Sequence, residues 1–408
     1  MACRLQCHGG RTARQRDRGD LSPTCALGHC RPTIHAQEQP SGQTVHSHAS
    51  REKAVPDRHD RTTASEESGM RGSATFSRRH EMVVLAAGVS VGCTGKVVEP
   101  APTARYNATA RLNADGKVLH LVGGADRSGL LNDAWVLDIP HRQWVQVNGP
   151  PTPILSGCSA RVDDEIWVFG GSRSAREESD RLSTWETLGG RWFEEDSGSV
   201  RPEARREATL TRVGDGQALL FGGNTDDAAD PGETFGDVWG LDRQGPTWTE
   251  VATTDGPIGR QRHAAVQDGS RLWIHGGVDP SGAALAELWS LDLTTWVWTN
   301  HTVLDTGPAA RADHLLGYHD DRLIVWGGAI DDPLVWVYDI TDAEWTAHDA
   351  GGPTTRDAFA WDQVDGEPWM VLVGGDPVAS DDYATDVWFL ELDAIVWTEA
   401  KRLDGSAF

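Results

Sequence analysis

Short apolar runs recur between residues 100 and 400 of the 408-residue chain, at intervals of about fifty residues. Four examples are Val118–Val122, Glu165–Phe169, Leu323–Trp326 and Met370–Val373, each apolar at nearly every position. A strand that does not alternate apolar with polar residues is buried on both faces. The pattern therefore predicts β-strands sandwiched between neighbouring layers of strands, with no helix needed to cover them.

A pair of glycines follows each of these apolar runs. The spacings between successive pairs are 47, 52, 54, 51 and 47 residues. The six pairs are Gly123 and Gly124, Gly170 and Gly171, Gly222 and Gly223, Gly276 and Gly277, Gly327 and Gly328, and Gly374 and Gly375. We expect the backbone to leave the strand there in a conformation, or at a packing distance, that a side chain would obstruct. A period near fifty residues is typical of β-propellers.

Tryptophan and arginine share the same period. A tryptophan follows each glycine pair, and in five of the six units a second tryptophan comes nine residues later, as in Trp239 and Trp248. Five units also begin with Pro-x-x-Arg, and the arginines are Arg105, Arg205, Arg260, Arg311 and Arg356. The second unit has Ile154 in place of arginine and a charged insertion over residues 173–181. It is predicted to be the irregular unit.

An arginine-led first strand, an apolar strand ending in Gly-Gly and two tryptophan-bearing strands resemble the Kelch repeat. The resemblance covers about 300 residues, from Pro100 to Glu399. It implies an all-β fold: a six-bladed propeller of four-stranded antiparallel blades around a central channel, over residues 101–400, with a C-terminal tail at 401–408. No spare strand is evident for closing the ring, unless Val97 and Val98 pair with the last blade.

Charge separates the first 93 residues from the rest. They hold 13 Lys and Arg against 9 Asp and Glu, whereas the remaining residues hold 24 against 52, a net charge of −28. An acidic surface of this size disfavours nucleic acid and anionic membranes and favours basic partners or cations. The propeller is therefore not expected to bind nucleic acid.

The N-terminal region is expected to lie outside the folded domain. Residues 1–69 contain too few large apolar residues to form a core, which predicts a disordered or spurious upstream extension. Zinc binding is the alternative for this segment, with thiolates and imidazoles as ligands. The candidates are Cys3, Cys7, His8, Cys25, His29 and Cys30.

A secretory leader is predicted over residues 70–93, where a basic stretch precedes a short apolar run and small residues. Ser90–Cys93 resembles a bacterial lipoprotein box, which implies lipidation of Cys93 and a tether over residues 94–100. The expected location is outside the cytoplasm, either membrane-anchored by lipid or periplasmic or extracellular.

The five arginines are the candidate ligand-binding residues. At equivalent positions they would converge near the channel and bind a carboxylate or a sugar acid by bidentate contacts. The alternative is structural: each arginine binds a carbonyl of a neighbouring blade or an acid in the turn after the third strand. Those acids are Asp138, Asp242, Asp292 and Asp339.

Acid–base chemistry has three candidate residues: His263 and His314, each three residues after an arginine, and nearby Glu207. The acidic loops around Asp226–Glu233, Asp331–Asp332 and Asp376–Asp382 could offer oxygen ligands to calcium, although they match no known calcium loop. No metal and no cofactor are expected. Galactose oxidase shares the Kelch-type propeller, but its tyrosine and histidine copper ligands have no counterpart motif here.

The sequence thus predicts an exported module that binds another protein or a carbohydrate through its loops. The alternative is a carbohydrate-active enzyme, since repeat number and export resemble the N-acetylneuraminate epimerases. A purely structural surface protein is the third possibility. Propellers carry many unrelated activities, so the fold alone does not decide between them.

Overall fold

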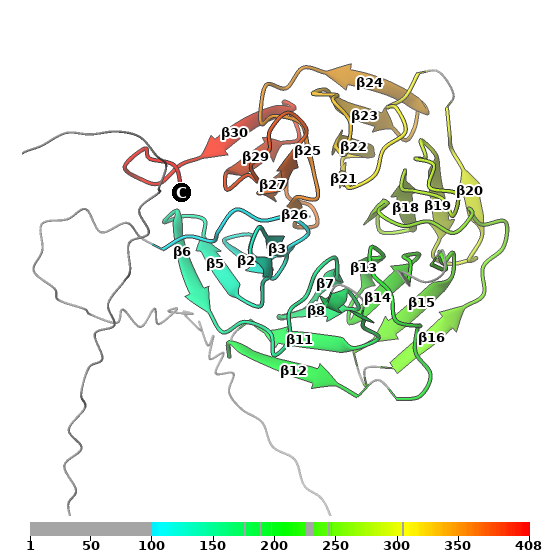
Figure 1. The fold of residues 1–408 in the computed structure, drawn as a ribbon. Helices are drawn as coiled ribbons and strands as arrows, with labels where there is room; N and C mark the ends of the chain where they lie inside the picture. Colours follow the sequence, from blue (N-terminus) through cyan, green and yellow to red (C-terminus); the bar gives the residue numbers. More distant parts are fainter. Residues whose placement is uncertain are drawn as a thin grey trace, which may run out of the picture. The chain divides into compact units, whose positions relative to one another are not determined.

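The computed structural model describes residues 100–408, except 175–176, 188, 197, 226–231, 244, 246 and 304–305. These residues form strands, turns and loops, and no helix among them could span a membrane. Six four-stranded antiparallel sheets form the blades, arranged in a ring (Figure 1). The predicted six-bladed Kelch-type propeller is confirmed. The extension, the zinc candidates, the leader with Cys93, and Val97 and Val98 lie outside the described residues.

Each blade consists of four strands that lie side by side in the order in which they occur along the chain. Blade 1 contains β1 (Thr109–Leu112), β2 (Val118–Val122), β5 (Ala134–Asp138) and β6 (Gln143–Val147). Blade 2 contains β7 (Cys158–Val162), β8 (Glu165–Phe169), β11 (Leu182–Glu186) and β12 (Arg191–Glu195). Blade 3 contains β13 (Thr209–Gly214), β14 (Gln217–Phe221), β15 (Val238–Asp242) and β16 (Thr247–Val251).

The other half of the ring repeats this order. Blade 4 contains β17 (Ala264–Gln267), β18 (Arg271–His275), β19 (Leu288–Asp292) and β20 (Trp298–Asn300). Blade 5 contains β21 (His314–His319), β22 (Arg322–Gly327), β23 (Val335–Asp339) and β24 (Glu344–His348). Blade 6 contains β26 (Ala360–Gln363), β27 (Trp369–Val373), β29 (Val387–Glu391) and β30 (Val396–Ala400).

Three two-stranded pairs lie in loops outside the blades. They are β3 (Ala125–Asp126) with β4 (Gly129–Leu130), β9 (Ser172–Ser174) with β10 (Glu177–Glu178), and β25 (Arg356–Asp357) with β28 (Asp376–Pro377). The second pair overlaps the charged insertion over residues 173–181. Blade 2 itself keeps all four strands in regular register. The irregularity of the second unit is therefore confined to its loops.

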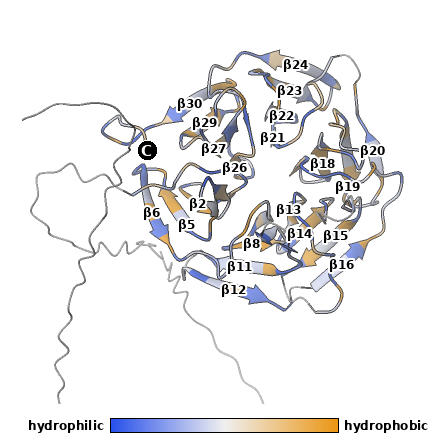
Figure 2. Ribbon diagram, viewed as in Figure 1, coloured by the Kyte–Doolittle hydropathy of each residue, from blue (hydrophilic) through white to orange (hydrophobic). Residues whose placement is uncertain are grey.

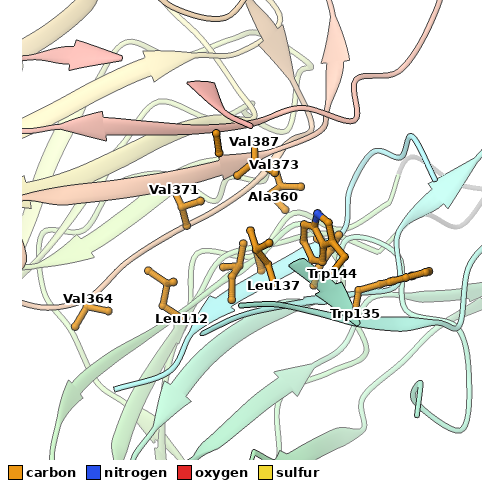
Figure 3. Close-up of a cluster of buried hydrophobic side chains, with 13 residues drawn as sticks. Leu112, Trp135, Leu137, Trp144, Ala360, Val364, Val371, Val373 and Val387 are labelled. Carbon is orange, nitrogen blue, oxygen red and sulfur yellow. The ribbon is translucent and has the colours of Figure 1, made fainter. Parts of the chain in front are cut away.

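The core lies between the blades. In Figure 3, Leu112, Leu137 and Trp144 of blade 1 face Ala360 and other apolar side chains of blade 6. The second tryptophan of four units is buried in the equivalent interfaces: Trp144, Trp248, Trp298 and Trp397. Outer strands are more polar, as the hydrophilic colour of β12 shows in Figure 2. Inter-blade tryptophans thus supply the packing that the apolar runs predicted.

The ring closes between blades 6 and 1 without a shared strand in the described residues. The backbone N–H of Leu112 donates to Asp362 Oδ2 at 2.6 Å, and Arg111 donates to the carbonyl of Trp361 at 3.2 Å. Arg111 also forms an ion pair with Asp362 at 3.4 Å. Asp362 thus accepts from both the backbone and a guanidinium of blade 1.

Replacing Asp362 by alanine should therefore lower the free energy of unfolding by about 2 kcal/mol, because the backbone N–H of Leu112 loses its acceptor and Arg111, which keeps its bonds to backbone carbonyls, loses its counter-ion. Urea unfolding measures the change. The control is Asp342→Ala, which removes an exposed carboxylate from a turn of blade 5. Equal stabilities of the two variants would show that the closure does not depend on Asp362.

Candidate functional site: the mouth of the central channel

The repeated arginines are buried and bonded within their own blades. Their exposed fractions lie between 0 and 3%. Each guanidinium donates to the carbonyl of the first glycine of its own pair, at 2.9 to 3.2 Å. Each also binds a carboxylate at 2.5 to 2.7 Å. The pairs are Arg105 with Asp133, Arg205 with Asp237, Arg260 with Glu287, Arg311 with Asp332, and Arg356 with Asp386.

The first tryptophan of each of these units shares that carboxylate. Its indole N–H donates to the same side chain at 2.6 to 3.0 Å. The tryptophans are Trp135, Trp239, Trp289, Trp336 and Trp388. The carboxylate that binds each arginine thus precedes the third strand of the blade. The sequence had suggested the acids at the end of that strand, such as Asp138. These contacts support the structural alternative for the arginines, and their ligand-binding role stays a prediction.

Two residues after each repeated arginine, and two after Ile154 in the second unit, the chain places a side chain near the centre of the ring. The backbone is left-handed at all six positions, with φ between 51° and 58°. We call these residues the mouth ring: Asn107, Ser156, Glu207, Arg262, Asp313 and Ala358. Such a conformation is costly for residues other than glycine and persists only where neighbouring structure holds it.

Backbone hydrogen bonds connect the mouth ring from blade to blade. The N–H of Ser156 donates to the carbonyl of Asn107, that of Glu207 to Ser156, and so on through Arg262 and Asp313. The N–H of Asn107 donates to Ala358 at 2.7 Å and so links blade 1 to blade 6. All six residues line a cavity of about 450 Å³. The ring therefore holds one side chain per blade at fixed positions around a cavity.

The glycine-pair loops lie at the same end of the blades as the mouth ring. In blade 1, Thr109 of β1 pairs with Val122 of β2, so the start of the first strand adjoins the end of the second. We call this end the loop face. It comprises the segments before each first strand and those between the second and third strands. Near the other end, Arg212 of blade 3 binds Asp365 of blade 6 at 2.9 Å. Because blades 3 and 6 are opposite in a ring of six, this ion pair crosses the channel.

Carboxylates outnumber cations at the mouth ring. Arg262 forms an ion pair with Asp313, whose pKa is raised by burial although Arg262 opposes the shift. Despite its own burial, Arg262 has a raised pKa because Asp313 and Glu207 favour its charged form. Burial and the nearby Asp313 raise the pKa of Asp357 to about 6, with Arg262 acting in the opposite direction. Asp313 and Asp357 thus share one guanidinium in an environment that disfavours their ionisation.

The raised pKa of Asp357 predicts a pH-dependent cost to stability. The folded state holds this proton more tightly than the unfolded chain, where the pKa is about 4, so stability should fall as pH rises from about 4 to 6. Asp357→Asn is expected to raise the melting temperature at pH 7.5, with the gain vanishing below pH 4. Thermal melts across this range, with Asp342→Asn as control, measure the effect. A gain that is the same at both pH values would contradict it.

The two candidate histidines lie one residue beyond the mouth ring, between blades. Burial lowers the pKa of His263 to about 3, and its Nε2 lies 2.9 Å from Thr209 Oγ1. Burial also lowers the pKa of His314 well below its usual value, and its Nε2 lies 2.9 Å from Nδ1 of His275. Neutral, enclosed imidazoles are weak bases. Glu207 lies in the mouth ring instead, beside Arg262. An acid–base role for the three stays a prediction that this geometry does not favour.

Arg262, Asp313 and Asp357 were not singled out from the sequence. The available signal was positional: the second residue after the repeated arginine is polar in four of the five units that have one. Comparing the residue at this position in each unit would have identified Asn107, Glu207, Arg262 and Asp313. The left-handed backbone that turns these residues towards the channel was not evident from residue types, because only glycine and asparagine commonly indicate it.

Three carboxylates in the candidate calcium loops already have protein partners. Asp332 binds Arg311, Asp331 accepts a hydrogen bond from Thr355, and Asp382 pairs with Arg127. In the described part of the chain, one group has metal-ligand geometry: His319, Asp320 and Asp393, on the opposite end from the loop face. Arg322 lies 3.7 Å from Asp393 and would compete with a cation there.

Comparison with known proteins agrees with this architecture. The family model described as the KLHDC2/KLHL20/DRC7 Kelch-repeats domain matches residues 80–266 and 208–406. The chain belongs to the Kelch-repeat family. The solved structure of YjhT superposes with a TM-score of 0.60 at 16% identity, covering 74% of this chain and 99% of YjhT. At that identity the likeness shows the fold alone.

Three curated relatives are larger proteins. Acyl-CoA-binding domain-containing protein 4 of Arabidopsis thaliana is 26% identical over 65% of this chain and 41% of its own length. The Rab9 effector protein with kelch motifs of Xenopus laevis is 26% identical over 43% of this chain and 48% of its own. Human host cell factor 1 is 27% identical over 67% of this chain and 14% of its own. The chain spans less than half the length of these relatives.

Proposed function

We propose that the protein is a binding module that recognises another protein through its loop face. The observation that carries the proposal is the mouth ring: six side chains, one from each blade, around a cavity of about 450 Å³. The repeated arginines are bonded within their blades, whereas the mouth presents acids that exceed its cations. Concave sites with a few convergent polar groups are where propellers and other folds bind ligands. The name of the Rab9 effector relative, which describes action on another protein, agrees with this proposal.

A carbohydrate ligand is less well supported. A sugar acid would meet Glu207 and Asp313 at the mouth, and the one guanidinium of the mouth ring, Arg262, is already paired with Asp313. Like charges across a binding site oppose association. The geometry therefore offers the epimerase-like alternative no cationic subsite at the mouth ring.

Export and lipid anchoring at Cys93 complete the proposal. They rest on the basic and apolar segment at residues 70–93. The intact mass and membrane partition of protein from its native host test them. A mature chain that begins at an acylated Cys93 is expected, and an unprocessed N-terminus at Met1 would contradict both export and anchoring.

Site-specific photo-crosslinking in the native host tests the binding face. A photoreactive residue at exposed Ala379, in the loop between β28 and β29, should give a discrete adduct with another protein. The same residue at exposed Asp342, in the turn between β23 and β24, should give none. Adducts confined to position 342 would contradict recognition through the loop face.

A further inference from the structure

Beside the mouth ring, blades 6 and 1 bring two tyrosines and two carboxylates together. Tyr106 and Asp357 occupy equivalent positions, each directly after a repeated arginine. The residues that follow them, Asn107 and Ala358, are joined by a 2.7 Å backbone hydrogen bond, so Tyr106 and Asp357 lie in adjacent segments. Asp376 is the strand partner of Asp357 in the β25–β28 pair. The ring of Tyr383 packs on that of Tyr106 at a centroid distance of 4.8 Å.

We call Tyr106, Tyr383, Asp357 and Asp376 the tyrosine–carboxylate patch. All four side chains are partly exposed. Among the described residues, neither Asp357 nor Asp376 forms an ion pair. Arg127, between β3 and β4, pairs with Asp382 and donates to the carbonyl of Asp381. Arg262, which favours the charged form of Asp357, is paired with Asp313.

The electrostatic environment of the patch favours a positive charge. Burial raises the pKa of Tyr106, and Tyr383 and Asp376 add to the shift, so negative charge is unfavourable around the tyrosine pair. Asp357 experiences the same repulsion from Asp313 and Asp376. A positive group placed here would neutralise both carboxylates and contact the electron-rich face of an aromatic ring, which attracts cations. Carboxylates that lack a counter-ion and lower stability are typical of binding sites rather than of scaffold positions.

We infer that the tyrosine–carboxylate patch binds a lysine or arginine side chain of a basic segment in the partner protein. The inference rests on the proposed function and names the chemistry of the partner. A side chain from an extended segment has the reach to place its charge between Asp357 and Asp376 while the segment crosses the loop face. The strongly acidic charge of the propeller, −28 for residues 94–408, would attract such a segment from a distance.

The test uses an eight-residue peptide of alternating glycine and lysine, with the full-length protein and isothermal titration calorimetry at low and moderate salt. Wild-type protein is expected to bind this peptide and not the matching glycine–glutamate peptide. The double variant Asp357→Asn with Asp376→Asn should weaken binding at least tenfold. Tyr383→Leu should weaken it severalfold through loss of the aromatic contact. A double control, Asp342→Asn with Asp349→Asn, lowers the charge equally outside the patch and should change affinity less than twofold.

Each other outcome overturns a defined part of the inference. If the patch variant and the control variant weakened peptide binding equally, the peptide would be attracted by the net charge of the protein and not by a specific site. Equal affinity for spermine, which has ammonium groups and no peptide backbone, would overturn recognition of a protein segment. Thermal melts of each variant exclude misfolding as the cause. Crosslinks from position 379, together with peptide binding by the Asp357→Asn, Asp376→Asn variant that equals that of wild type, would reject the inference but not the proposed function. Crosslinks solely from position 342 would reject the proposed function.

Discussion

Replacing Arg311 by alanine is expected to lower the free energy of unfolding by about 3 to 5 kcal/mol. The side chain is fully buried and donates to three acceptors: Ala309 O at 3.0 Å, Gly327 O at 3.1 Å and Asp332 at 2.7 Å. Alanine would leave all three without this donor. Asp332 would keep its contact with the indole of Trp336 but lose the charge that holds its pKa below the usual range. A partly buried carboxylate that loses its counter-ion is a costly defect in a folded protein.

The matched control for Arg311 is Arg127→Ala. Arg127 also forms an ion pair, with Asp382 at 2.7 Å, but both side chains are mostly exposed. Exposed pairs contribute about 0 to 1 kcal/mol, so this variant should unfold close to wild type. Urea denaturation of both variants gives the comparison. If Arg311→Ala lost no more stability than Arg127→Ala, the arginine–carboxylate–tryptophan contacts within each blade would not contribute to the stability of the propeller.

Gly276→Ala should lower stability by about 3 kcal/mol or more. Gly276 has φ of +65°, and an added Cβ would lie 2.5 Å from the carbonyl oxygen of Arg311 and 2.7 Å from Cε1 of His314. That carbonyl accepts a hydrogen bond from Gly277 at 2.9 Å, which links blade 4 to blade 5. The oxygen cannot move away without weakening the link between the blades. The substitution therefore combines backbone strain with an inter-blade clash.

Gly282→Ala separates these two contributions. Gly282 also has a positive φ, +85°, but no atom lies within 4 Å of the position its Cβ would take. This variant should lose only about 1 to 2 kcal/mol, from backbone strain alone. Chemical denaturation of the two variants measures the difference. Equal losses would mean that the glycine pairs serve turn geometry and not close approach of neighbouring blades.

The repeat could be predicted from the sequence because its strongest constraints act on residue type. Only glycine fits the left-handed turn beneath a neighbour's carbonyl, and only large apolar side chains fill the space between blades. The second tryptophans, such as Trp248 and Trp298, are accordingly buried between blades. Blade 2 appeared irregular because it lacks the arginine. Its backbone nevertheless keeps the contact that the other units make, since Gly124 donates to the carbonyl of Ile154 at 2.8 Å as the other pairs do to arginine carbonyls.

The acid that binds each repeated arginine was harder to predict than the positions of the repeated residues themselves. Asp133 and Asp138 both flank Trp135, and residue type does not distinguish the acid that binds Arg105 from the one that caps the next turn. The mouth ring was missed for a related reason. Its residues differ from blade to blade, and a search for shared residues therefore overlooks it. Blade closure through Asp362 likewise joins residues that are 250 positions apart.

Hydrogen–deuterium exchange of the full-length protein, with and without the glycine–lysine peptide, tests recognition at the mouth most directly. Binding at the tyrosine–carboxylate patch predicts slower exchange in residues 104–108, 355–358 and 375–384. Exchange in the turns at the opposite end, such as residues 340–343, should stay unchanged. Protection of those turns, or protection spread evenly over both ends of the blades, would contradict recognition through the loop face.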